Sequence, residues 1–235
     1  MTRGFLFYIM KLQKRRGDIL EKLEKMADFF AARADMYDEH MINDVEGCRE
    51  GYALMADIVP ENTEKLLDLG CGTGLELEKI FEKFPKLEVV GIDLCEEMLL
   101  RLKEKYSGKR LIIICGDYFS EEFGENFDCA VSFQTMHHFK KEKKLELYRK
   151  ICDALKPCGV YIECDYMVDT QQQEDLWFSE NSRIRRELGI GEDEFYHYDT
   201  PCTVKNQLEL FEKSGFTSAE TVMRIENTTM IVARK

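Results

Sequence analysis

The sequence predicts an α/β fold: a doubly wound, seven-stranded and mostly parallel sheet that ends in an antiparallel hairpin. Three observations support this prediction. Short β-branched apolar runs alternate with charged helical stretches from residue 65 to about residue 165, as in parallel βαβ units buried on both faces. Glycines alternate where the first of these strands meets its helix, at Gly70, Gly72 and Gly74. Two strand-like runs flank Glu226 and Asn227, which indicates a closing hairpin.

The region before the sheet is helical in pattern. Ile19, Leu20 and Leu23 recur at helix spacing among Glu and Lys, with Asp18 as a candidate N-cap. We interpret the first 25 residues as an extension that the core fold does not require. The predicted organisation is therefore an N-terminal helical extension or cap over residues 1–60 and a second domain over residues 61–235.

The sheet region contains five predicted strands with helices between them. The strands are expected at residues 65–69, 87–92, 110–115, 127–133 and 159–165. The intervening helices are expected at residues 75–84, 95–106 and 140–155. Pro85 and Pro157 follow the first and last of these helices, where proline stops helical hydrogen bonding.

The C-terminal region completes the fold and supplies a predicted lid over about residues 166–203. A helical pattern covers residues 171–188, and a polar and aromatic stretch without periodicity, residues 189–201, indicates a loop. The last helix has Thr203 as its expected N-cap and Gly215 just beyond its end.

Composition narrows the function classes. The 235 residues are 44% hydrophobic and 33% charged, which is typical of a globular domain with a full core. A net charge of -12 repels nucleic-acid phosphates, so we expect no nucleic-acid partner. The 9 cysteines are odd in number and form no CxxC pair, which favours free thiols in a cytoplasmic protein. The apolar run at residues 4–10 is too short to span a bilayer, so we expect no membrane association.

The glycine-rich junction indicates the kind of ligand. Glycines at the carboxyl end of a first parallel strand let a ligand approach the backbone at a topological switch point. A dinucleotide loop needs its third glycine at the position of Leu75, and its pyrophosphate would meet the Asp68 carboxylate. That carboxylate favours a cation instead. S-adenosylmethionine (SAM) carries an ammonium and a sulphonium group and no phosphate.

The ends of the next strands add polar groups to the same crevice. Asp93 ends the second strand, where a carboxylate can accept hydrogen bonds from both ribose hydroxyls. Asp117 follows the third strand and is placed to accept from an adenine amino group, with Tyr118 against the ring. The fourth strand leads into the sequence FQTMHHF beside the glycine loop.

In these motifs the chain resembles the class I SAM-dependent methyltransferases that act on small molecules, a Rossmann-like family. The motifs occur in that family's order, and they are LLDLGCGTG, VVGIDLCEEML, CGDYF, FDCAVSFQTMHHF and LKPCGVYIECD. The resemblance covers about residues 65–235. The chain departs from the family at Cys158, where many relatives have glycine, and we expect Gly159 to maintain the turn.

The resemblance implies a SAM site at the strand ends. Asp68 and the glycine-loop backbone would hold the methionine part, the backbone of Gln134 would contact the same amino-acid moiety, and Asp93 would bind the ribose. An N-terminal aromatic residue would fold over the cofactor. The implied cofactor-binding residues are Asp68, Gly70, Cys71, Gly72, Gly74, Asp93, Leu94, Met98, Asp117, Tyr118, Gln134 and Tyr37.

Candidate catalytic residues follow the fourth and fifth strands. His137 and His138 can orient an acceptor or act as a base near neutral pH, or they cap the next helix and pack on the sheet. Asp165 lies near the carboxyl end of the fifth strand and is a candidate for contact with the acceptor.

The aromatic loop offers candidate substrate contacts. Tyr196, His197, Tyr198 and Asp199 either form a wall of the lid or pack inward as an ordinary surface loop. Since the histidines of the chain form neither HxxxH nor HxH sets, we expect no metal site.

The sequence therefore predicts a SAM-dependent methyltransferase that transfers a methyl group to a small molecule by in-line displacement. Positioning and desolvation supply most of such catalysis. Two alternatives stay open: a SAM-using enzyme that does not methylate, similar to carboxy-SAM synthase, and a non-catalytic SAM-binding regulator. The sequence indicates neither the acceptor atom nor an oligomeric state.

Overall fold

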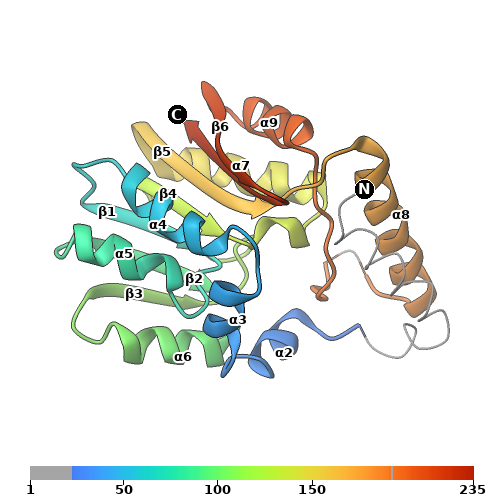
Figure 1. Cartoon of the computed structure of the whole chain (residues 1–235), viewed down its shortest axis with the longest axis horizontal. Helices are drawn as coiled ribbons and strands as arrows, with labels where there is room; N and C mark the ends of the chain where they lie inside the picture. Colours follow the sequence, from blue (N-terminus) through green and yellow to red (C-terminus); the bar gives the residue numbers. More distant parts are fainter. Residues whose placement is uncertain (1–22, 192) are drawn as a thin grey trace.

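The computed structural model describes residues 23–191 and 193–235. Its centre is a seven-stranded sheet of order β3-β2-β1-β4-β5-β7-β6, in which β7 is antiparallel to β5 and β6 (Figure 1). Strands β1 to β5 pair in parallel. The prediction of a doubly wound, mostly parallel sheet with a closing hairpin is confirmed. The helix predicted around Asp18, Ile19 and Leu20 lies outside the described residues.

The sheet strands match the predicted order. Their bounds are β1 (Lys65–Leu69), β2 (Glu88–Asp93), β3 (Arg110–Cys115), β4 (Phe127–Phe133), β5 (Leu155–Tyr166), β6 (Ser218–Ile225) and β7 (Thr228–Arg234). The helices are α2 (Met26–Ala31), α3 (Tyr37–Asn43), α4 (Cys48–Ile58), α5 (Leu75–Lys83), α6 (Glu96–Lys105), the 3-10 turn η2 (Met136–His138), α7 (Lys141–Ala154), α8 (Gln171–Leu188) and α9 (Val204–Lys213).

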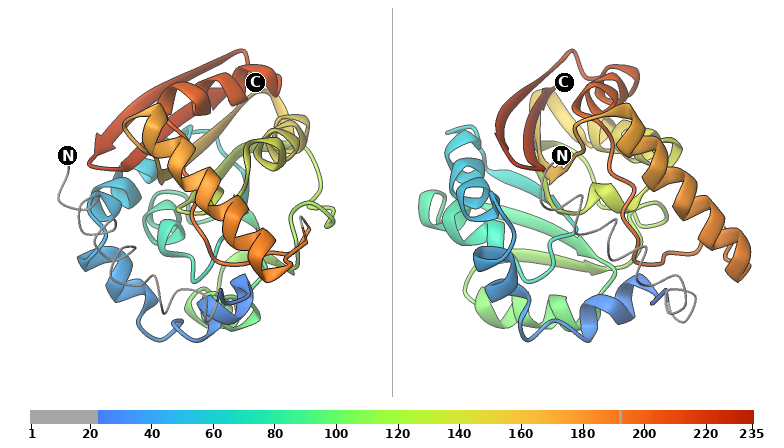
Figure 2. Two further views of the ribbon diagram at one scale, coloured as in Figure 1. Left: turned by 90° about the vertical axis from the view of Figure 1, so that its right-hand side faces the viewer. Right: turned by 45° about the vertical axis from the view of Figure 1, so that its right-hand side comes forward.

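Helices cover both faces of the sheet, as Figures 1 and 2 show. Adjacent residues of β1 point to opposite faces, so Leu66 packs in one core with residues of α4, α5 and α6, whereas Leu67 packs in a second core with residues of α7 and α9. Both leucines are fully buried. Burial on two faces explains why the strands read as apolar runs rather than as alternating patterns.

Helices α2 and α8 lie at the side of the sheet where the parallel strands end (Figures 1 and 2). The α8 N-terminus has a reciprocal capping box between Thr170 and Gln173. At α9, the Thr203 hydroxyl accepts from the Asn206 amide at 3.3 Å, and Gly215 follows the helix with φ 103°. The expected cap and stop of α9 are therefore confirmed. The boundaries of the predicted cap, domain and lid stay predictions.

One local expectation was wrong. Strand β5 begins at Leu155 rather than at residue 159, and its pairing with β4 shifts register between Phe127 and Cys129. The left-handed residue of this irregularity is Cys158, with φ 65°, and not Gly159. Gly159 is needed for space, because a Cβ there would lie 2.8 Å from the Lys156 carbonyl oxygen. The turn therefore uses both residues, and cysteine occupies the conformation that suits glycine.

Candidate active site

The glycine loop joins β1 to α5 with three left-handed residues in alternation. The φ angles are 70° at Gly70, 44° at Gly72 and 74° at Gly74. A Cβ at Gly70 would overlap the Thr135 side chain, and a Cβ at Gly74 would lie 2.6 Å from Leu102 Cδ1. At Gly72 the nearest heavy atom would be a backbone oxygen 3.9 Å away. Two of the glycines therefore serve close packing, whereas Gly72 keeps the loop surface open.

The second strand fixes this loop in place. At the end of β2, Asp93 Oδ2 accepts from the Gly72 amide at 2.9 Å, and Oδ1 accepts from the Cys95 amide at 2.8 Å. Burial raises the pKa of Asp93, although these amides oppose the shift. The carboxylate thus ties the loop to β2 and retains further lone pairs for a ligand.

A pair of acids lies buried beneath the loop. Asp68 of β1 is fully buried, and Glu76 in the first turn of α5 is 5% exposed. No basic, amide or hydroxyl donor among the described residues reaches either oxygen of Asp68. Burial raises the pKa of Asp68 well above its ordinary value, and the charge of Glu76 raises it further. Buried acids without a counter-ion are costly, and a nearby cationic ligand would relieve that cost.

A small crevice of about 40 Å³ adjoins the loop. Eight of the predicted cofactor-binding residues line it: Tyr37, Gly70, Gly72, Asp93, Leu94, Met98, Tyr118 and Gln134. The N-terminal segment also contributes Met26, Ala27 and Phe30. Because ligand pockets usually hold about 300–1,000 Å³, the crevice must widen for a nucleoside-sized ligand to enter, and α2 forms part of its wall.

The structure does not place the four remaining predicted cofactor residues in the crevice wall. Asp68, Cys71, Gly74 and Asp117 are not among the described residues that line it. The Asp117 carboxylate accepts from the Phe119 amide at 3.0 Å, so it stabilises its own turn. Its predicted contact with adenine stays a prediction without geometric support.

Gln134 stands where the sheet order reverses, between β1 and β4. It has φ 50°, its amide donates to the Cys164 carbonyl at 2.7 Å, and Nε2 donates to Thr228 Oγ1 at 3.3 Å. A non-glycine residue held in the left-handed region stores strain of the kind that clusters at binding sites.

A larger cavity of about 920 Å³ adjoins the crevice. Phe30, Tyr37, Gln134 and His138 line both spaces, so they form a common wall. Helices α2 and α3, the loop around residue 199 and the hairpin turn at residues 226–228 provide the other walls. A ligand in this cavity therefore lies next to one bound at the glycine loop.

His137 lies in this cavity wall and is held by the end of β5. Its Nδ1 is 2.7 Å from Asp165 Oδ1, and the Asp165 side chain is 1% exposed. Burial alone would lower the pKa of His137, but the Asp165 carboxylate outweighs it and raises the pKa. The structure thus places Asp165 against a histidine, where it orients the ring.

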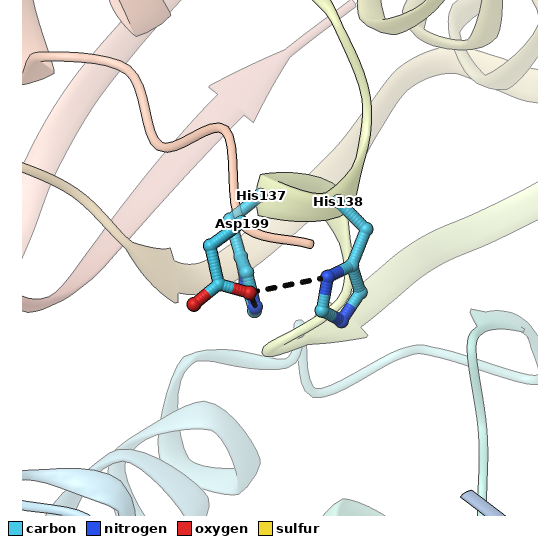
Figure 3. Close-up of side chains that lie close together, drawn as sticks. All are labelled: His137, His138 and Asp199. Atoms are coloured by element: carbon cyan, nitrogen blue, oxygen red, sulfur yellow. Dashed lines mark ion pairs between the residues drawn. The ribbon is translucent and has the colours of Figure 1, made fainter. Parts of the chain in front are cut away.

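The Asp199 carboxylate lies close to the rings of both histidines, as Figure 3 shows. Its Oδ1 lies 3.6 Å from His137 Nε2 and 3.5 Å from His138 Nδ1. Thr200 fastens the loop, since its amide donates to the His137 carbonyl at 2.6 Å. The spacing of His137, His138 and Asp199 in the sequence did not indicate that they would meet. The fold brings one donor atom from each of the three side chains within 4.8 Å of one another. The expectation of no metal site stays an untested prediction.

The predicted lid residues separate into two groups. His197 lines the large cavity and stacks on Phe29, with ring centroids 3.5 Å apart. Tyr196 forms an isolated antiparallel bridge with Lys25, and Tyr198 packs edge-on against Trp177 at 6.0 Å. Among the described residues that line the cavity, the loop contributes His197 and Asp199 and neither tyrosine.

Comparisons of the chain with known proteins agree with this fold. A family model for the methyltransferase domain matches residues 66–159, from β1 to the start of β5. The central part of the chain is therefore similar to a methyltransferase domain. The fold agrees with a solved structure of a putative O-methyltransferase from Nostoc punctiforme, at 21% identity and a TM-score of 0.68, over 91% of this chain and 62% of the other. SAM, the cofactor predicted from the sequence, is the cofactor of this family.

Two relatives differ in how they align with the methyltransferase domain and its flanking regions. A carboxy-S-adenosyl-L-methionine synthase of Nautilia profundicola is 24% identical over 91% of this chain and 96% of its own length. A phosphoethanolamine N-methyltransferase of Plasmodium falciparum is 32% identical over 65% of this chain, which spans 58% of that protein.

In the described part of the chain, no helix has the length and apolar character that a membrane span requires.

Proposed function

We propose that the protein binds SAM at the glycine loop and transfers its methyl group to a small molecule in the 920 Å³ cavity. The observation that carries the proposal is the common wall of Phe30, Tyr37, Gln134 and His138. With this wall, an acceptor in the large cavity would lie next to the methionine end of a cofactor bound at the loop, as in-line transfer requires.

The cofactor site uses the charges of SAM. The buried Asp68 and Glu76 would attract the ammonium and sulphonium groups through the loop, and Asp93 would accept from the ribose hydroxyls. Leu94, Met98 and Tyr118 line the crevice and would supply apolar contact for the adenine. These residues fit SAM better than a phosphorylated cofactor, because a nearby cation favours the ionised form of the two buried acids whereas a pyrophosphate would oppose it.

The cavity favours a neutral or cationic acceptor. Five acids line it, namely Glu39, Asp44, Glu46, Asp199 and Glu226, against the single arginine Arg33 among the described lining residues. The arginine is already paired, because its Nη1 lies 2.9 Å from Glu24 Oε2. Aromatic rings in the same wall add attraction for a cation.

The experiment is direct. Isothermal titration with SAM and S-adenosylhomocysteine should show binding, and incubation of SAM with a panel of amines, phenols and thiols should yield S-adenosylhomocysteine and a methylated product by mass spectrometry. Absence of binding by either ligand to a folded sample would refute the proposal.

A second candidate is favoured by one observation: the alignment with carboxy-SAM synthases covers nearly the whole length of both chains. Mass spectrometry of the ligand that co-purifies separates the two. A carboxylated SAM supports the synthase, whereas SAM or S-adenosylhomocysteine supports methyl transfer.

A further inference from the structure

We propose that His137, His138 and Asp199 bind a divalent transition-metal ion, for which Zn²⁺ is the reference ion, at the inner wall of the large cavity. All three side chains line that cavity, and the donor atoms are His137 Nε2, His138 Nδ1 and Asp199 Oδ1. Two imidazoles and a carboxylate are donors that Zn²⁺, Fe²⁺ and Co²⁺ prefer, whereas Mg²⁺ and Ca²⁺ prefer oxygen alone.

The distances fit ligands of one ion better than direct hydrogen bonds. Asp199 Oδ1 is 3.6 Å from one imidazole nitrogen and 3.5 Å from the other. Charge-assisted hydrogen bonds are usually about 2.7–2.9 Å long. Donors that lie about 2.0–2.2 Å from a tetrahedral ion are separated from one another by about 3.4 Å. The two separations from Asp199 Oδ1 therefore correspond to edges of a metal polyhedron, and the two imidazole donors lie within 4.8 Å of each other.

The donor atoms are buried and unsatisfied. The side chain of His138 is 5% exposed, and neither its Nδ1 nor Asp199 Oδ1 makes a hydrogen bond of normal geometry with the described residues. Buried polar atoms normally have such partners, so two buried donor atoms without one, close to a third donor, indicate that this group can bind a ligand.

The surroundings preorganise the site. Asp165 Oδ1 holds His137 Nδ1 at 2.7 Å, which turns the opposite ring nitrogen toward Asp199. Metal-binding histidines usually have such a carboxylate partner on the other nitrogen. Thr200 is 1% exposed and donates to the His137 carbonyl, which fixes the loop that carries Asp199.

The site would be of the open type. Three protein ligands leave a coordination position toward the cavity, as in catalytic rather than structural zinc sites. If methyl transfer is the reaction, which is the part that rests on the proposed function, an ion there would hold and polarise the acceptor's oxygen or nitrogen. Binding of the ion itself does not depend on that function.

The test is titration of chelator-treated full-length protein with Co²⁺, read by visible absorption, followed by displacement with Zn²⁺ and metal analysis of the dialysed complex. The wild type should bind one equivalent and show a ligand-field band. Asp199→Asn and His138→Gln should weaken binding at least about 100-fold, and Asp165→Asn about 10–100-fold as a positioning residue.

The matched control is His40→Ala, which removes an exposed histidine of the same cavity that pairs with Asp44. This variant should bind Co²⁺ like the wild type. The proposal is overturned if the wild type binds no stoichiometric Co²⁺, or if binding survives in folded Asp199→Asn and His138→Gln, or if it is lost in His40→Ala. Titration of Asp199→Asn with S-adenosylhomocysteine should still show binding, so failure of the metal site and failure of the SAM site give different results.

Discussion

Substitution of the loop glycines separates backbone strain from steric overlap. Gly70 and Gly72 both have positive φ, but a Cβ at Gly70 would overlap Thr135 whereas one at Gly72 meets only a backbone oxygen 3.9 Å away. Gly72→Ala should therefore lower the free energy of unfolding by about 1–2 kcal/mol, the cost of a left-handed alanine. Gly70→Ala adds overpacking, which costs a further 1–3 kcal/mol or so.

The assay is urea unfolding followed by circular dichroism, together with melting temperatures. For a chain of this size, the additional loss should lower the melting temperature of Gly70→Ala by about 2–12 °C relative to Gly72→Ala. Thr135→Ala removes the hydroxyl and methyl that a new Cβ would overlap, so the double variant Gly70→Ala/Thr135→Ala should be more stable than the sum of the single effects predicts. Equal losses for the two glycine variants, or strict additivity in the double variant, would refute this account of the loop.

Three further predictions concern other parts of the site and the sheet. Asp93→Asn loses one charge-assisted hydrogen bond, to either the Gly72 or the Cys95 amide. The SAM affinity measured by calorimetry should therefore fall at least about 10-fold. An unchanged affinity would contradict the role of this carboxylate. Burial, with the Asp165 charge, raises the pKa of Glu163 from 4.5 to about 7. The folded state therefore holds this proton more tightly than the unfolded chain. As pH rises from 4.5 to 7, the wild type should lose about 3 kcal/mol of unfolding free energy relative to Glu163→Gln. A difference between the two proteins that does not change with pH would disprove the raised pKa of Glu163. Cys158→Gly removes a left-handed cysteine and should raise the free energy of unfolding by about 1 kcal/mol in urea, and a loss would show that the turn is not strained.

The order of the elements was predictable because each depends on local signals. Apolar runs specified β1 to β4, and the last helix was bounded correctly by Thr203 and Gly215. The start of β5 was not predictable in the same way, since a proline inside the run Leu155–Tyr166 resembles a helix stop and gives no sign of a register shift.

The site was predictable only where its residues follow strands directly. Gly72, Asp93 and Gln134 lie at strand ends that a parallel sheet must bring together, and all three line the crevice. The partnership of Asp199 with the two histidines depends on how a loop folds back, which hydrophobic periodicity does not encode. Asp68 is fully buried, interacts with Glu76 of α5 and is not among the described residues that line the crevice, and this placement likewise depends on tertiary packing.

The backbone link between the N-terminal segment and the loop before α9 has a kinetic consequence. The Met26 amide donates to the Phe195 carbonyl at 3.0 Å, and the His197 amide donates to the Glu24 carbonyl at 3.1 Å. Met26 lines the crevice and His197 lines the larger cavity, so one short ribbon of main chain spans both. If SAM and an acceptor bind as proposed, breaking these two bonds would loosen the walls of both spaces together, and release of the two products would then be coupled.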